Sequence, residues 1–134
     1  MIQKTFEAKR ENLHEVLAFT EGELEKHDCN MKTQMMISIM VEEIFVNIAS
    51  YAYPDGEGEA TITMDFTDDK VAMAFIDNGV AFNPLEKEDP DITLSAEERD
   101  IGGLGIYMVK QTMEDVKYER INNENHLSFR KAIH

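Results

Sequence analysis

Apolar side chains recur along the first third of the chain with the spacing of helices. After Asn12, which we expect to cap a helix, they follow an i, i+3, i+4, i+7, i+11 pattern, and this predicts an amphipathic helix with one exposed face. The positions concerned are Leu13, Val16, Leu17, Thr20 and Leu24. A second helix is predicted over residues 32–53, where apolar residues lie on nearly all sides. It ends before Pro54, whose ring is incompatible with helical geometry, and we expect it to be buried.

Alternation with a period of two predicts strands. Residues 3–10 are a candidate first strand, and residues 61–66 alternate between polar and apolar side chains, which is typical of a strand with one face in the core. Residues 71–76 are apolar on both faces and therefore predict a central strand. The tail predicts a hairpin of residues 117–121 and 126–133 that turns through residues 122–125.

Between the central strand and the hairpin lies a segment of a different kind. Residues 84–100 are charged and form a long connection, which is typical of a functional lid. A helix is predicted from Leu104 onward, with Ile106, Val109, Met113 and Val116 on its apolar face. We therefore predict an α/β two-layer sandwich in which helices cover one face of a mixed, mostly antiparallel sheet.

Length and charge limit the classes of function. The 134 residues, 43% of them hydrophobic, suffice for one core, so we expect a single domain over residues 1–134. A net charge of −14 opposes direct contact with nucleic acid. The longest apolar run, residues 35–48, is interrupted by polar residues and is shorter than the roughly 20 residues that cross a bilayer, so no membrane partner is expected. With no secretory leader in the first residues and Cys29 as the single thiol, we expect a cytoplasmic protein.

Metal and thiol catalysis are not indicated. The four histidines lack the paired spacing of metal sites, and Cys29 has no neighbouring base in the sequence. The nine methionines, among them Met35, Met36 and Met40, fall mostly at core-like positions, and we interpret them as packing rather than as a binding surface.

Two polar residues share one stripe of the second predicted helix. At about 100° per residue, Glu43 and Asn47 lie within roughly 40° of each other, between apolar residues on both sides. Glu42 falls in a sector that faces water, so the two neighbouring glutamates are not equivalent. Since a carboxylate is costly to bury without a partner, Glu43 and Asn47 suggest a site, although an exposed helix edge explains the same spacing.

Two further motifs follow. Asp77-Asn78-Gly79 ends the central strand, where an Asp accepts a hydrogen bond from an amine and Gly79 lets the backbone approach a flat ring; a plain turn uses the same residues. Gly103-Leu104-Gly105 opens a helix, where free backbone N–H groups and the helix dipole favour a phosphate; a glycine-rich cap without a ligand is the alternative.

The order of these three motifs is more specific than any one of them. Together they resemble the N, G1 and G2 boxes of the GHKL (Bergerat) ATP-binding fold, a histidine kinase-like family. The flanking residues 47–53, 82–85 and 101–106 are similar to those of the bacterial anti-sigma factor serine kinases. The sequence departs from that pattern at Tyr51, where the family often has His, and at Ala81, where it often has Gly or Pro.

The resemblance implies a ligand and a role for each motif. ATP would bind with its adenine amine on Asp77 and its ring against Gly79, while Asn47 ligates Mg²⁺ and Glu43 is the general base. The turn of Gly103, Leu104 and Gly105 would contact the phosphates. Ser128, where the family often has Thr, is a candidate to support the adenine contact, although an alternating strand also explains a serine there.

The implied function is that of a serine/threonine protein kinase that phosphorylates an anti-anti-sigma partner of the STAS type, sequesters a sigma factor, or does both. A homodimer is possible within this family. Two alternatives stay open: a nucleotide-dependent protein-binding module without phosphotransfer, and an acidic α/β domain that binds no nucleotide.

Overall fold

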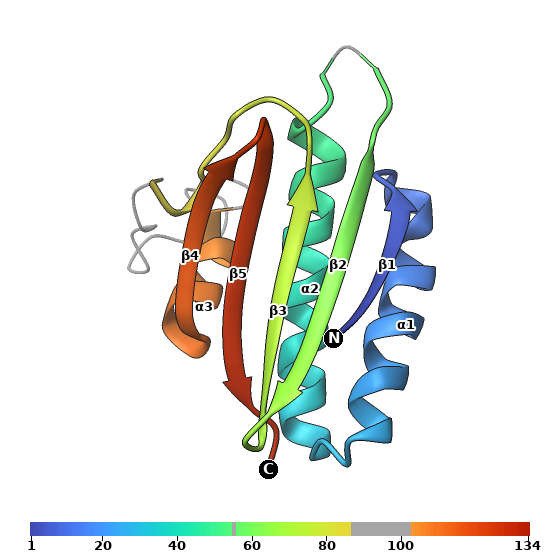
Figure 1. Ribbon diagram of the computed structural model, residues 1–134, viewed down its shortest axis with the longest axis vertical. Helices are drawn as coiled ribbons and strands as arrows, with labels where there is room; N and C mark the ends of the chain where they lie inside the picture. The colour runs from blue at the N-terminus through green and yellow to red at the C-terminus, as the bar shows by residue number, and fades with distance from the viewer. Residues whose placement is uncertain (55, 87–102) are drawn as a thin grey trace.

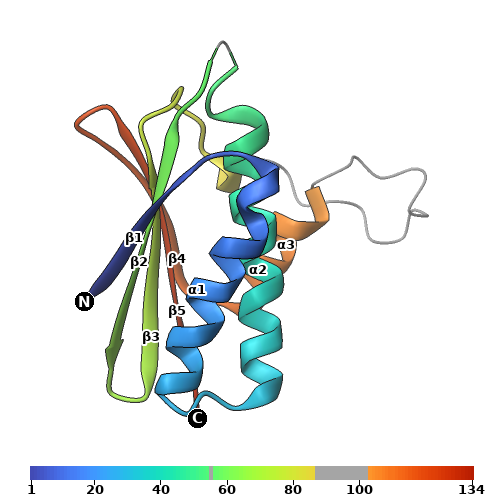
Figure 2. The same ribbon diagram turned by 90° about the vertical axis from the view of Figure 1, so that its right-hand side faces the viewer.

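The chain folds into one sheet with helices on one of its faces. The computed structural model describes residues 1–54, 56–86 and 103–134, with side chains from Ile106 onward in the last range. Within these residues a five-stranded sheet has the order β1-β2-β3-β5-β4, and every neighbouring pair is antiparallel. Figures 1 and 2 show α1, α2 and α3 together on one face of this sheet, while no helix of the described residues lies over the other face. The predicted two-layer α/β sandwich is confirmed, with a sheet that is entirely antiparallel in the described residues rather than mixed.

The elements follow the predicted order with small shifts at their ends. The strands are β1 (Ile2–Glu7), β2 (Glu59–Thr67), β3 (Lys70–Asp77), β4 (Glu114–Ile121) and β5 (Glu124–Ala132). The helices are α1 (Leu13–Lys26), α2 (Met31–Tyr51) and α3 (Gly103–Thr112), with short 3₁₀ helices η1 (Arg10–Asn12) and η2 (Pro84–Glu86). None of the helices in the described residues is long and apolar enough to cross a membrane. The predicted lid lies outside the described residues from residue 87 to its end.

Strand β3 is central, as predicted, but it is buried on one face rather than two. Val71, Met73 and Phe75 point toward the helices and are fully buried, whereas the alternate residues Ala72 and Ala74 are partly exposed. The reason is architectural, because no helix of the described residues covers the other face of the sheet. The apolar run therefore reflects small side chains on an open face and not a sheet enclosed on both sides.

Helix α2 is the central helix of the helical layer, but one of its faces is exposed. Its N-cap is Asn30, whose side chain accepts a hydrogen bond from the backbone N–H of Thr33 at 2.9 Å. Met40 and Met73 lie in the core, as the sequence predicted for the methionines. The expectation is wrong for Met35, because the side chain is 61% exposed on the face of α2 that points away from the sheet.

Local geometry corrects one helix cap and one helix boundary. Helix α1 begins at Leu13, but the side chain of Asn12 does not cap it; the Asn12 amide donates to the carbonyl of Glu7 at 3.0 Å, because η1 makes the backbone helical before α1 begins. Helix α3 ends at Thr112, so Val116 belongs to β4 and not to the helix. The spacing of Val116 matched a helix by coincidence, since a strand also places it toward the core.

The C-terminal hairpin is confirmed with a tighter turn. Asn122 and Asn123 form the whole turn, with φ values of 51° and 64°, the left-handed conformation that Asn tolerates and that two-residue hairpins require. Glu124 and Asn125, which the sequence assigned to the turn, already belong to β5. This shift of two residues brings Asn125 opposite the end of β3.

Candidate functional site

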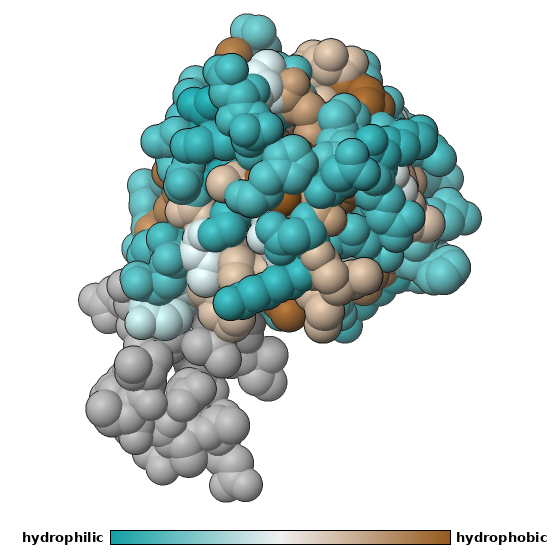
Figure 3. Space-filling model, turned by 90° about the horizontal axis from the view of Figure 1, so that it is seen from below, coloured by the Kyte–Doolittle hydropathy of each residue, from teal (hydrophilic) through white to brown (hydrophobic). Residues whose placement is uncertain are grey.

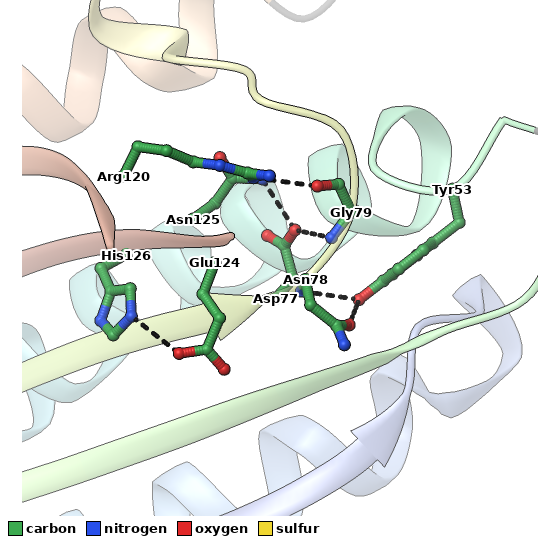
Figure 4. Close-up of polar contacts among 8 residues, drawn as sticks. All are labelled: Tyr53, Asp77, Asn78, Gly79, Arg120, Glu124, Asn125 and His126. Carbon is green, nitrogen blue, oxygen red and sulfur yellow. Dashed lines mark hydrogen bonds and ion pairs between the residues drawn. The ribbon is translucent and has the colours of Figure 1, made fainter. Parts of the chain in front are cut away.

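A carboxylate and an amide meet where β3 ends and β5 begins. Asp77 and Asn125 are directly opposite each other in the antiparallel register, and each is only 6% exposed. The side-chain amide of Asn125 donates to Oδ1 of Asp77 at 2.9 Å. Figure 4 shows the two side chains converging with Gly79 and Arg120 around them. Asp77, which the sequence singled out, therefore lies in a structured polar cluster and not in a plain exposed turn.

Asn125 connects four groups of this cluster. Besides the bond to Asp77, Nδ2 donates to the carbonyl of Val80 at 2.8 Å. Its Oδ1 accepts from the backbone N–H of Phe82 at 3.4 Å and from the hydroxyl of Tyr118. Because both ends of the amide are engaged, its orientation is fixed, and it fixes the carboxylate of Asp77 in turn.

The sequence patterns did not point to Asn125 or Tyr118. A signal for Asn125 existed, because a hairpin with a two-residue Asn-Asn turn places residue 125 inside the last strand, on the same face as Leu127. The sequence instead suggested Ser128 as a residue that supports the adenine contact. It pairs with Ala74 and Lys117 and lies on the face of the sheet opposite the cluster, so it has no contact with Asp77.

Close packing against α2 requires glycine at position 79. Its N–H donates to Oδ1 of Asp77 at 3.0 Å, and its carbonyl accepts from Arg120 at 2.9 Å. A Cβ at this position would overlap the carbonyl oxygen of Ala52 and come within 2.7 Å of the Ala52 Cβ. The next residue, Val80, donates its N–H to that same carbonyl at 2.9 Å. Glycine is thus required for the loop after β3 to pack against the end of α2.

Tyr53 anchors the other side of this loop. Its hydroxyl donates to the carbonyl of Glu59 at 2.6 Å. The same hydroxyl accepts from the backbone N–H of Asn78 at 3.1 Å, a contact that Figure 4 shows. Burial is the main reason why the pKa of Tyr53 is raised. Since Asn78 directly follows Asp77, Tyr53 and Asn125 hold the Asp77-Asn78-Gly79 segment from two sides.

Asp77 and Asn125 of this cluster line a small, mostly apolar cavity of about 40 Å³. Its lining residues come from α2, β3, the loop after β3, β4 and β5: Ile44, Asn47, Ile48, Ala52, Phe75, Asp77, Phe82, Pro84, Tyr118, Asn125 and Leu127. Asn47 and Asp77, two of the predicted site residues, therefore line one cavity. Apolar walls with a few convergent polar groups are typical of a site for a small flat ligand.

Glu43 lies one helical turn before Asn47 on α2. It is partly buried, whereas the neighbouring Glu42 is exposed, as the helical stripe predicted. Burial raises the pKa of Glu43, and the nearby charge of Glu42 raises it further. A partly buried carboxylate with a raised pKa, one helical turn from a residue that lines the cavity, is a candidate proton acceptor.

The glycine motif marks the beginning of α3, as predicted. The helix begins at Gly103 and includes Leu104 and Gly105 in its first turn. It packs beside α2 and against η2. The role of these three residues toward a phosphate stays a prediction. In the described part of the chain, no three His, Cys, Asp or Glu side chains are grouped to hold a metal ion.

In the described residues, an antiparallel sheet under three helices, with an Asp-x-Gly loop that lines one cavity together with an α2 carboxamide, and with glycines at the start of α3, defines a two-layer α/β sandwich with a candidate ligand site. The chain belongs to the histidine kinase-like ATPase domain family, whose model matches residues 6–131.

Curated relatives agree with this family. The serine/threonine-protein kinase BtrW of Bordetella bronchiseptica is 26% identical over 98 residues, which cover 72% of this chain and 69% of BtrW. The serine-protein kinase RsbW of Bacillus mycoides is 33% identical over 85 residues, covering 60% of this chain and 53% of RsbW. The match thus spans about half the length of the RsbW proteins.

Proposed function

We propose that this protein binds ATP with Mg²⁺ and transfers the γ-phosphoryl group to a serine or threonine of a partner protein. The observation that carries the proposal is the buried, doubly anchored carboxylate of Asp77 at the end of a cavity that Asn47 also lines. Two relatives that are named serine or serine/threonine kinases support the reaction class.

Asp77 is suited to select adenine. Oδ1 of Asp77 is held by two donors, the Gly79 N–H and the Asn125 amide, so the carboxylate stays in one orientation. In that orientation a carboxylate oxygen accepts from an exocyclic amine, which adenine has and which guanine lacks at the same position. A buried acceptor opposite a carbonyl oxygen would be unpaired and repelled, and this disfavours guanine.

Asn47 and the start of α3 are the proposed phosphate end of the site. The amide oxygen of Asn47 is a hard ligand of the kind Mg²⁺ prefers, and few protein ligands are needed when nucleotide phosphates and water complete the shell. Backbone N–H groups of Gly103, Leu104 and Gly105 would donate to phosphate oxygens at the positive end of the helix dipole. When bound, Mg²⁺ neutralises developing charge on the phosphates, which matters in a chain of net charge −14.

Glu43 is the proposed general base. As the partner's hydroxyl oxygen bonds to the γ-phosphorus and the bond to the β-phosphate oxygen breaks, the hydroxyl proton passes to the Glu43 carboxylate. The raised pKa of Glu43 makes it a better proton acceptor than an exposed glutamate. Glu42, exposed and on another face of α2, does not accept the proton and affects Glu43 only by raising its pKa, so Glu42→Ala serves as a matched control at a pH above that pKa.

The proposed partner is an anti-anti-sigma protein of the STAS type, with a sigma factor as a second protein that the chain sequesters in the cytoplasm. This assignment depends on the resemblance of the N-box and glycine motifs to the anti-sigma kinases. A nucleotide-dependent binding module that transfers nothing is the alternative, because Glu43 and Asn47 fit ATP binding in either case.

Labelled ATP tests the proposal directly. The protein is incubated with γ-labelled ATP, Mg²⁺ and an anti-anti-sigma protein, and the label on the partner is followed. We expect transfer with wild type and with Glu42→Ala, and transfer at least about 100-fold slower with Glu43→Ala. Tight Mg-ATP binding without transfer to any candidate would favour the binding module. A titration of ATP and Mg²⁺ without heat at several temperatures would overturn both functions.

A further inference from the structure

An apolar groove lies between α2 and α3, on the side of the helical layer away from the sheet. It is a shallow, open depression with a volume of about 500 Å³. Its lining residues are Met31, Lys32, Met35, Met36, Ile39, Met40, Met108 and Thr112, and we call this surface the methionine groove. Three of them are strongly exposed: Met31 by 69%, Met35 by 61% and Ile39 by 46%. Figure 3, which looks at the end of the molecule where α2 begins, shows apolar surface in patches among hydrophilic atoms.

The methionine groove differs in charge from the rest of the protein. The chain has 27 acidic residues against 13 basic ones, yet none of the eight described lining residues is acidic and one of them is Lys32. The net charge of −14 repels acidic partners from the protein as a whole, whereas the groove presents apolar atoms beside the cation of Lys32. Methionine side chains are flexible and polarisable, so they adapt to the shape of an apolar partner.

The methionine groove runs along α2 toward the position of Glu43. Met31, Met35 and Ile39 follow each other at intervals of four residues along one stripe of α2, and Glu43 comes four residues later. At 1.5 Å per residue, Ile39 lies about 6 Å and Met35 about 12 Å from Glu43 along the helix axis. A substrate protein whose hydroxyl reaches Glu43 must also contact the surface of α2 around Glu43. The methionine groove is the exposed apolar surface that lies nearest to Glu43 along this helix.

We propose that the methionine groove is the docking surface for the protein substrate. The proposal rests on the proposed function, since it places the hydroxyl of the substrate at Glu43. The partner it fits has a serine or threonine with an apolar ridge about two helical turns away, and a carboxylate that pairs with Lys32. Apolar burial in the groove supplies affinity, while the Lys32 pair sets the direction in which the substrate lies.

Steady-state transfer to the anti-anti-sigma protein tests the proposal, with Met35→Glu as the main variant. Because Met35 is mostly exposed, the variant is expected to fold, and its melting temperature and its affinity for Mg-ATP are measured as checks. The matched control is Ile121→Glu, which puts the same charge on another exposed apolar residue, at the end of β4. Lys32→Glu tests the proposed ion pair.

We expect Met35→Glu to raise KM for the protein substrate about tenfold or more, with kcat and the Kd for Mg-ATP unchanged, while Ile121→Glu behaves as wild type. Lys32→Glu should raise KM less, and this effect should disappear at high salt.

Transfer with unchanged KM in Met35→Glu would overturn the docking surface and leave the kinase function standing. A second result would also overturn the docking surface: sedimentation shows a dimer, and Met35→Glu dissociates this dimer without a change in KM. In that case the groove binds a second copy of the chain. Absence of transfer in wild type overturns the proposed function, and binding of the partner that is insensitive to Met35→Glu overturns the docking surface separately.

Discussion

The side chains of Asp77 and Asn125 lie 2.9 Å apart because antiparallel pairing puts the last residue of β3 opposite the second residue of β5. The pair joins two segments 48 residues apart in the sequence. It also determines the shape of the loop that follows β3, since Asn125 binds the carbonyl of Val80 and the N–H of Phe82. One amide thus orients both the carboxylate and the loop that borders the cavity.

Removal of this amide should affect both stability and nucleotide binding. We expect Asn125→Ala to lower the free energy of unfolding by about 2 kcal/mol, because it removes a hydrogen bond from the buried carboxylate of Asp77 and from the part-buried backbone groups of Val80 and Phe82. Under the proposed function it also weakens Mg-ATP binding, since Asp77 is no longer held. Urea unfolding and calorimetric titration measure the two effects. Ser128→Ala, on the opposite face of the same strand, should change neither; equal losses in both variants would contradict the role of Asn125.

The sequence predicted the elements of this fold well, because local rules determine them. Pro54 predicted the end of α2, and the alternation over residues 61–66 predicted strand β2. The faces of α2 were predicted relative to one another, so Glu42 and Glu43 were distinguished correctly. Two of the predicted site residues, Asn47 and Asp77, line one cavity, while their role toward a ligand stays a prediction.

What the sequence did not predict depends on contacts between distant segments. Periodicity orders the faces of α2 but does not say which of them a neighbour covers, so the exposure of Met35 was missed. The role of Asn125 depends on the length of the hairpin turn, and a difference of two residues moves it from the turn into β5. The need for glycine at position 79 comes from Ala52, which no local pattern connects with it.

Gly79 and Gly22 should respond in opposite directions to the same substitution. Gly79→Ala brings a methyl group into the carbonyl of Ala52, and we expect it to lower the free energy of unfolding by about 1–3 kcal/mol through a forced shift of the loop. Gly22 lies within α1, and a methyl group added there would meet no atom within 4 Å, so Gly22→Ala should raise stability by about 0.5–1 kcal/mol through helix propensity. Urea midpoints compare the two. Equal stability of wild type and Gly79→Ala would show that the loop yields without cost.

The pH dependence of phosphoryl transfer should report on Glu43. A general base must be ionised, so the rate should rise with pH through the pKa of Glu43, which lies above its ordinary value of 4.5. Glu42→Gln removes a like charge and lowers that pKa, so the rising limb of the pH–rate profile should move to lower pH, while Glu15→Gln on the exposed face of α1 should not move it. A limb that stays in place in Glu42→Gln would mean that a group other than Glu43 sets it.

His134 should make the stability of the fold depend on pH. Its Nε2 lies 3.0 Å from the carbonyl oxygen of His27, and its Nδ1 lies 3.1 Å from Oδ1 of Asp69. Both partners are acceptors, so both bonds form only when the imidazole carries two protons, and the pKa of His134 is accordingly raised, first by the His27 carbonyl and then by Asp69, with Asp28 adding to the negative field. Because the folded pKa lies above the ordinary 6.5, this contribution to stability is fully present below pH 6.5 and is lost as pH rises through the raised pKa.

We therefore expect the difference in urea midpoint between wild type and His134→Gln to be larger at about pH 5.5 than at about pH 8.5, and Asp69→Asn to reduce this difference. The exposed His14 on α1 gives the control, since His14→Gln should show no such difference between the two pH values. A wild-type advantage that is the same at both would assign the C-terminal contact to packing rather than to charge.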